Sequence, residues 1–163
     1  MAYPDDLLQF AQEMASLHIE QAHQPSLRRA VSSGYYALFH LLILDAIANC
    51  SDPQFRAALA RMFDHGPMKQ ASDRNHLYNV AETFSQAQQE RNDADYDLLK
   101  EWQPAQVSLL PEGIADAFQS WNTIRREAAA RDFLISMLSS RERKQSERTR
   151  SKPRASPTDA PRS

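Results

Sequence analysis

Helical periodicity constrains this chain more than any other feature of its sequence. Apolar residues recur at helical spacing through long segments rich in Ala, Leu, Gln, Glu and Arg, and no segment sustains an alternation of apolar and polar residues. The whole chain of 163 residues contains only three glycines, the residue that most weakens a helix interior after proline. We therefore predict an all-α protein.

The charge distribution separates a body from a tail. Residues 141–163 carry eight basic and three acidic side chains, so this segment has a net charge of +5 and leaves −7 on the rest of the chain. The tail contains three prolines and no large apolar residue, which is typical of a disordered segment. We predict a folded domain over residues 1–139 and a disordered basic tail over 140–163. A second interpretation makes the tail an arm that adds phosphate contacts independent of sequence.

Cysteine usage and the apolar runs favour a cytoplasmic protein. Cys50 is the single cysteine, which excludes an intrachain disulfide and leaves no CxxC pair for zinc or redox chemistry. The N-terminus lacks the basic region of a signal peptide, and the longest apolar run, Ala37 to Ile43, is broken by His40 and is too short to span a bilayer. We predict no membrane association, no cofactor and no metal site.

Capping residues and prolines set the expected helix boundaries. The first helix is expected from Pro4 to about Ala22, the second from a cap at Ser26 to about Asn49, the third over about 54–63, and the fourth from a cap at Asp73 to about Tyr96. A fifth helix starts either at Pro104 or at Pro111, and its apolar pattern extends to about Leu138. The sequence alone does not decide between these two starts.

The second predicted helix is the most apolar segment and is expected to be the central one. A polar stripe runs along one of its faces, formed by Arg29, Ser33, Tyr36 and His40. Gly34 lies on another, largely apolar face and indicates a close helix crossing.

The fourth predicted helix carries an apolar stripe that ends in charges. Its inward positions are Leu77, Val80, Ala81, Phe84, Ala87 and Gln88, and Arg91 and Asp95 continue the same stripe. A guanidinium is rarely taken out of water unpaired, so Arg91 requires Asp95, a partner on another helix, or an anionic ligand. An ion pair that only fixes packing is a simpler interpretation, since such networks often have no chemistry.

Two segments resemble the HEPN superfamily of helical bundles, found in prokaryotic defence and toxin–antitoxin systems. The likeness rests on the Ser-x-x-Tyr-x-x-x-His spacing of Ser33, Tyr36 and His40 and on the run Arg91-Asn92-Asp93-Ala94-Asp95-Tyr96-Asp97. The segment Asp64 to Lys69 and the terminal Ala129-x-x-Asp132-Phe133-Leu134 also resemble small members of the superfamily. The resemblance covers roughly Asp5 to Leu138. It implies an up-and-down bundle of four to five main helices.

The resemblance also implies a symmetric homodimer whose arginine motifs meet near the subunit interface, and in active members a metal-independent endoribonuclease. Arg91 and Asn92 match the arginine and polar residue of that motif. The motif histidine is missing, because Tyr96, Asp97 and Leu98 occupy the places where it would fall, and no histidine follows His76. The acid/base group of the family mechanism therefore cannot come from this segment.

Three functions follow as expectations. The leading one is a degenerate member that binds RNA, a nucleotide or a protein partner such as a cognate antitoxin-like protein. Its expected site combines Arg29, Ser33, Tyr36, His40, Arg91, Asn92, Asp95 and Tyr96. The second is an active ribonuclease toxin that uses Arg91 and His40 as catalytic residues, because His40 is the nearby side chain that titrates near neutral pH. The third is a purely structural partner-binding bundle.

Overall fold

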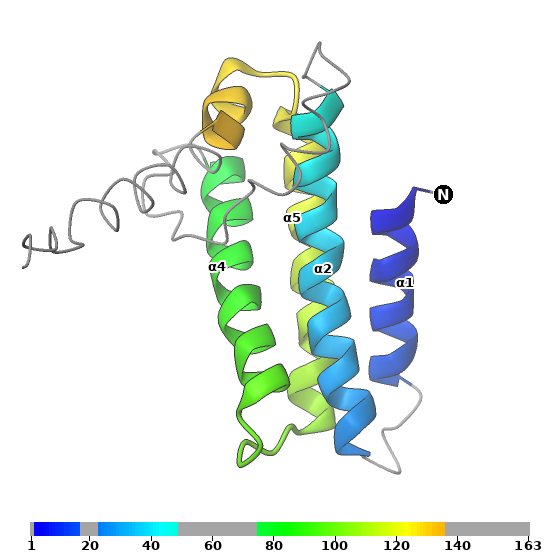
Figure 1. Cartoon of the computed structure of the whole chain (residues 1–163). Coiled ribbons are helices and arrows are strands. Elements are labelled where there is room, and N and C mark those ends of the chain that lie inside the picture. Colours follow the sequence, from blue (N-terminus) through cyan, green and yellow to red (C-terminus); the bar gives the residue numbers. More distant parts are fainter. Residues whose placement is uncertain (1, 17–22, 49–74, 136–163) are drawn as a thin grey trace, which may run out of the picture.

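The computed structural model describes residues 2–16, 23–48 and 75–135, and within these ranges every regular element is a helix. The main helices are α1 (Tyr3–Ser16), α2 (Gln24–Ala48), α4 (Asn75–Tyr96) and α5 (Pro104–Ile124), followed by a helical segment over 128–135. Successive main helices run in opposite directions along one another (Figure 1). The predicted all-α, up-and-down bundle is confirmed.

Helix α2 is the central element, as its apolar composition predicts. It packs against α1, α4 and α5 (Figure 1), and it buries residues on every side, from Leu27 to Ala46. By length and composition α2 could cross a membrane, which the short run Ala37–Ile43 did not indicate. However, 72% of its most apolar window is buried inside the protein. The apolar surface of α2 is therefore covered by its neighbouring helices.

The start of α2 differs from the prediction. The helix begins at Gln24, so Ser26 lies inside its first turn and does not cap it. Pro25 fits this first turn because its missing N–H would have had no helical partner there. Gln24 is held by the backbone of Trp102: its Nε2 donates to the Trp102 carbonyl oxygen at 2.8 Å, and its Oε1 accepts from the Trp102 amide at 2.9 Å.

Gly34 marks a close helix approach, as predicted. A Cβ atom at Gly34 would lie 2.8 Å from Cδ1 of Ile114 and 3.9 Å from Cβ of Ala11. Residue 34 therefore faces α5 and α1 together, and any side chain there would require Ile114 to move. Glycine at this position lets α1 and α5 both pack closely against one point of α2.

The apolar stripe of α4 is also confirmed. Leu77, Val80, Ala81, Phe84 and Ala87 are all buried, and Gln88 is half-buried. Phe84 packs against Tyr35 and Phe39 of α2, with ring centroids 5.5 and 6.4 Å apart. This contact positions the last turns of α4, which carry the charged cluster, beside the first half of α2.

Helix α5 begins at Pro104 and continues through Pro111, which decides between the two predicted starts. Gln103 has an extended backbone and Pro104 occupies the first turn. Pro111 removes one helical hydrogen bond, but it is buried between Val107 and Ile114, which are buried as well. Burial of the apolar residues on both sides of Pro111 thus allows α5 to continue as a single helix.

A buried carboxylate connects the C-terminal ends of α2 and α5. Asp45 of α2 accepts a hydrogen bond of 2.5 Å from the Trp121 Nε1 and pairs with Arg125 at the end of α5. The predicted continuous pattern to Leu138 is interrupted by a turn over 125–127 before residues 128–135.

Several predictions fall outside the described residues. They are the end of the first helix at Ala22, the third helix over 54–63, the segment Asp64–Lys69, the cap at Asp73, the apolar end at Leu138 and the tail over 140–163.

Candidate functional site

Arg91 lies near the end of α4 and is turned toward α2. Its Nη2 donates to the Tyr36 hydroxyl oxygen at 2.9 Å, and its Nε lies 2.8 Å from Oδ2 of Asp95. The Nε–H is not aligned for a hydrogen bond with this carboxylate, so the contact is an ion pair. Only 22% of the Arg91 side chain is exposed. Of the three alternatives predicted for Arg91, two are thus present together: Asp95 on the same helix and Tyr36 on another helix.

Asp95 connects Arg91 to α2 through its second oxygen. The Ser32 hydroxyl, which is buried, donates to Oδ1 of Asp95 at 2.6 Å. One carboxylate therefore holds the guanidinium on its own helix and a hydroxyl on the neighbouring helix. This arrangement fixes the orientation of Arg91, because a short charge-assisted hydrogen bond locks its counter-ion.

Two tyrosine rings flank the guanidinium. The Cζ atom of Arg91 lies 5.5 Å from the centroids of both Tyr36 and Tyr96, within the range of a cation–π contact. Tyr96 is 73% exposed, while Tyr36 is half-buried. Burial acts to lower the pKa of Arg91, but its interactions with Tyr36, Asp95 and Tyr96 outweigh burial and raise that pKa above its usual value. Arg91 is therefore a permanent cation, partly exposed where α4 meets α2.

The guanidinium retains hydrogen-bonding capacity. Its Nη1 donates to Oδ1 of the neighbouring Asn92 at 3.1 Å, so Nε, Nη1 and Nη2 each have one protein partner. An arginine has five N–H donors, two on each Nη. Among the described residues, the second N–H of each Nη has no partner, and such a pair of donors suits a bidentate contact with a phosphate or carboxylate.

His40 lies one turn beyond Tyr36 on α2. Its ring contacts Tyr3, Phe39 and Tyr36, with centroids 5.1, 5.5 and 6.2 Å apart, and it makes no hydrogen bond within the described part of the chain. Burial lowers the pKa of His40 below 6.5. Tyr36 contacts both His40 and Arg91. Within the described ranges, His40 makes no hydrogen bond to Tyr36, Asp95 or Arg91.

The polar stripe of α2 is displaced by one residue from the prediction. Arg29 is exposed, and Ser33 is buried without a polar contact to the described residues. Their neighbours Arg28 and Ser32 make the contacts to α4. The row Arg28, Ser32, Tyr36 and His40 has a constant spacing of four residues. The row through Arg29 and Ser33 also fits helical spacing, so the sequence held no signal that separates the two.

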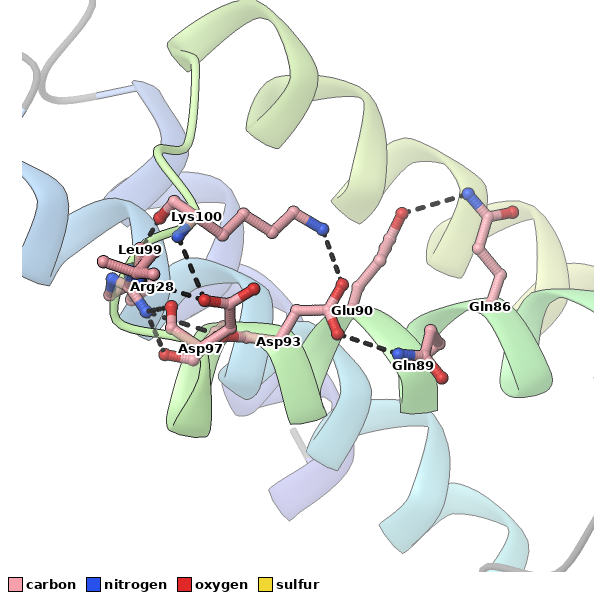
Figure 2. A network of polar contacts seen from close by, with 9 residues as sticks. Arg28, Gln86, Gln89, Glu90, Asp93, Asp97, Leu99 and Lys100 are labelled. Atoms are coloured by element: carbon pink, nitrogen blue, oxygen red, sulfur yellow. Dashed lines mark hydrogen bonds and ion pairs between the residues drawn. The ribbon is translucent and has the colours of Figure 1, made fainter.

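Arg28 holds the end of α4 and the turn that follows (Figure 2). Its Nη1 donates to the carbonyl oxygens of Ala94 at 2.8 Å and Asp97 at 2.9 Å, and its Nη2 donates to that of Lys100 at 2.6 Å. These carbonyls have no helical partner at a C-terminus, and a cation there also complements the helix dipole. Arg28 therefore shapes the turn beside the site.

The three aspartates of the motif have separate partners. Asp93 pairs with Lys100 at 2.7 Å, and Asp97 accepts from the amides of Leu99 and Lys100 (Figure 2). Asp95 pairs with Arg91. The Lys100 contact lowers the pKa of Asp93. Within residues 2–16, 23–48 and 75–135, no group of three acidic, histidine or cysteine side chains is placed to hold a metal.

Fold and site together define an all-α bundle with a fixed, partly exposed arginine between two tyrosines, where α2 meets α4. Comparison with models of known protein families, with curated proteins and with solved structures finds no significant match for this chain.

Proposed function

We propose that this chain is an HEPN-like module that binds RNA or a nucleotide at the Arg91 site. The supporting observation is the Arg91 guanidinium, held between the rings of Tyr36 and Tyr96 with unused N–H donors. A fixed cation beside an exposed aromatic face suits a phosphate together with a stacked base. The proposal includes a role in prokaryotic defence or a toxin–antitoxin pair in the cytoplasm, which rests on the HEPN resemblance alone.

We propose binding without cleavage. Cleavage through the ribose 2′-hydroxyl requires a group that accepts a proton near neutral pH within hydrogen-bond reach of the reacting atoms. Tyr96, Asp97 and Leu98 stand where the HEPN motif carries its histidine. A phenol titrates near pH 10 in its ordinary state and is a poor base. The degenerate motif thus keeps a cation but lacks its acid/base partner.

A metal-independent endoribonuclease is the second candidate, and one observation favours it. Burial lowers the pKa of His40, so its imidazole is neutral and able to accept a proton at pH 7. Its ring also contacts Tyr36, the residue that binds Arg91. In this alternative, Arg91 stabilises the transition-state charge and His40 is the base.

RNA binding is tested by fluorescence anisotropy with a labelled single-stranded oligonucleotide. Arg91→Ala should weaken binding by about tenfold or more, because a charge-assisted contact typically contributes at least 1.5 kcal/mol. Tyr96→Ala should weaken it to a similar extent through lost stacking. Tyr78→Ala is the matched control, since Tyr78 is another exposed tyrosine of α4, 57% exposed and outside the site. Equal losses for Tyr78→Ala and Tyr96→Ala would contradict the proposal.

Cleavage distinguishes the two candidates. The binding module should leave the oligonucleotide intact in the presence of EDTA. Cleavage that disappears in both Arg91→Ala and His40→Ala would establish the ribonuclease instead. A complete lack of salt-sensitive RNA affinity would favour the third possibility, a purely structural partner-binding bundle, in which the Arg91 network only fixes packing.

The homodimer that the resemblance implies has a suitable surface beside Arg91. The turn after α4 exposes Leu98 and Leu99, which are 83% and 93% exposed, next to Tyr96. Arg28 holds this turn in place through the carbonyls of Asp97 and Lys100. A rigid apolar tip favours contact with a second copy or with an antitoxin-like protein.

We expect a dimer whose interface includes this tip. Leu98→Asp combined with Leu99→Asp should shift the molar mass from dimer to monomer in light scattering without lowering helix content, because both side chains are exposed in the single chain. Leu109→Asp is the control at an exposed leucine of α5, 65% exposed. A dimer that persists in the double variant would place the interface elsewhere.

A further inference from the structure

A hollow of about 380 Å³ lies between α4 and α5, separate from the Arg91 site. Its size falls within the range of small-molecule pockets, which is about 300–1,000 Å³. Its apolar wall comes mainly from Leu109, Leu110 and Ile114 of α5. The polar groups of the lining come from Thr83, Gln86, Glu90, Lys100, Trp102 and Gln106. A pocket that combines an apolar wall with polar groups can bind an organic ligand and fix its orientation.

Gly113 keeps this hollow open. A Cβ atom at Gly113 would have no neighbour within 4 Å, whereas one at Gly34 would press on Ile114. Gly113 also has no positive φ that would call for glycine, and it lies in the middle of α5. Glycine weakens a helix interior, so Gly113 lowers the stability of α5, and no close packing requires a glycine at this position. Its structural effect is the space that it leaves in the wall.

Glu90 presents an incompletely paired carboxyl group at the hollow. Its Oε1 accepts from the Nε2 of Gln86 at 3.1 Å (Figure 2), but its Oε2 is shielded from solvent and has no hydrogen-bond partner within the described residues. Burial raises the pKa of Glu90. The last torsion of a glutamate is soft, so either oxygen can turn toward a ligand.

The nearby cation is already engaged. Lys100 Nζ pairs with Asp93 at 2.7 Å and lies 4.3 Å from the ring centroid of Trp102. It therefore offsets the charge of Glu90 only in part. The buried Nε1 of Trp102 is a second polar atom without a partner in the described part of the chain. Among the described residues, the hollow is thus bordered by one carboxylate oxygen without a donor, Oε2 of Glu90, and by one indole N–H without an acceptor, that of Trp102.

We propose that this hollow binds a small organic cation, an amine or amidine carried on an apolar or aromatic body. The cationic N–H groups donate to Glu90, and the apolar body packs against Leu109, Leu110 and Ile114. A cation is favoured over a neutral or anionic ligand because the unmet group is a half-buried carboxyl, for which a charged donor restores the lost solvation.

Benzamidine is the probe for this site, followed by the indole N–H resonances in two-dimensional NMR. Benzamidine should shift the Trp102 resonance saturably at millimolar concentration and leave that of Trp121, which is bound to Asp45 in the core, unchanged. Neutral benzamide and anionic benzoate should bind at least about tenfold more weakly. Equal binding of the three probes, or the lack of a saturable shift, would overturn the proposal.

Variants test the Glu90 carboxyl group and the open space at Gly113 separately. Glu90→Gln should weaken benzamidine binding about tenfold or more, while Glu112→Gln, an exposed position on α5 outside the hollow, should not. Gly113→Leu should abolish binding and raise the Tm, because it fills the open space and removes a helix glycine. Unchanged binding in Gly113→Leu, or a lowered Tm, would show that the space is not the site. None of these outcomes depends on RNA binding at Arg91.

Discussion

At the scale of single residues, His40 shows how burial tunes a group beside the Arg91 site. Its ring lies among Tyr3, Tyr36 and Phe39, and no hydrogen bond from the described residues stabilises the imidazolium. Burial penalises the charged form, so the pKa of His40 in the folded protein is below 6.5. The neutral histidine is compatible with a packing role and with the base that the ribonuclease alternative requires.

The lowered pKa of His40 predicts a dependence of stability on pH. Because the unfolded chain binds this proton more readily, the unfolded state takes up protons first as the pH falls below about 6.5. The contribution of His40 to the free energy of unfolding is therefore complete above pH 6.5 and is lost as the pH falls through the folded pKa. In urea titrations across this window, His40→Gln should lose less stability on acidification than the wild type. Parallel curves would contradict the burial argument.

At the scale of elements, the junction between α4 and α5 depends on one guanidinium. Arg28 donates to the carbonyls of Ala94, Asp97 and Lys100, which lie across the end of α4 and the following turn. Within the described ranges no other element covers this turn, since Leu98 and Leu99 are exposed. The geometry of the turn therefore relies on hydrogen bonds to α2 more than on apolar burial.

Arg28→Ala should lower the free energy of unfolding by about 1–3 kcal/mol, the range for losing charge-assisted hydrogen bonds that water partly replaces. Arg29→Ala removes the same charge from the neighbouring, exposed position and should change it by less than about 0.5 kcal/mol. Urea denaturation of the two variants measures the difference. If both variants lose the same stability, then net charge, and not the contacts of Arg28, holds the turn.

The same pair of arginines shows what the sequence could predict. The stripe of α4 was predictable because its apolar positions admit one inward face, and Arg91 and Asp95 follow from its continuation. The polar row of α2 was not, because Arg28-Arg29 and Ser32-Ser33 are adjacent identical pairs that both fit a row through Tyr36. The choice depends on where the end of α4 lies, which is tertiary information. Periodicity likewise could not decide whether burial around Pro111 keeps α5 continuous.

At the scale of the whole molecule, most of the chain carries a negative net charge, which disfavours binding of the proposed RNA ligand. The residues before 141 carry a net charge of −7, so the body as a whole repels a polyanion, and Arg91 acts as a local exception. Residues 141–163 carry +5, so the proposal assigns the compensating attraction to them. Site and tail should therefore contribute in different ways: Arg91 through one fixed contact, and the tail through counterion release.

Deletion of residues 141–163 should weaken binding to single-stranded RNA most at low salt and should flatten the dependence of log K on log salt. Each neutralised phosphate contributes about 0.7 to that slope on a single strand, so losing even three or four tail contacts would reduce it by roughly 2–3. Arg91→Ala in the full-length chain should reduce the slope by about 0.7 and lower affinity at every salt concentration. The control keeps the length of the tail but replaces its eight basic residues with glutamine, and it should behave like the deletion. If that control binds like the wild type, the tail does not act through its charge, and the attraction that offsets the acidic body must come from elsewhere in the chain.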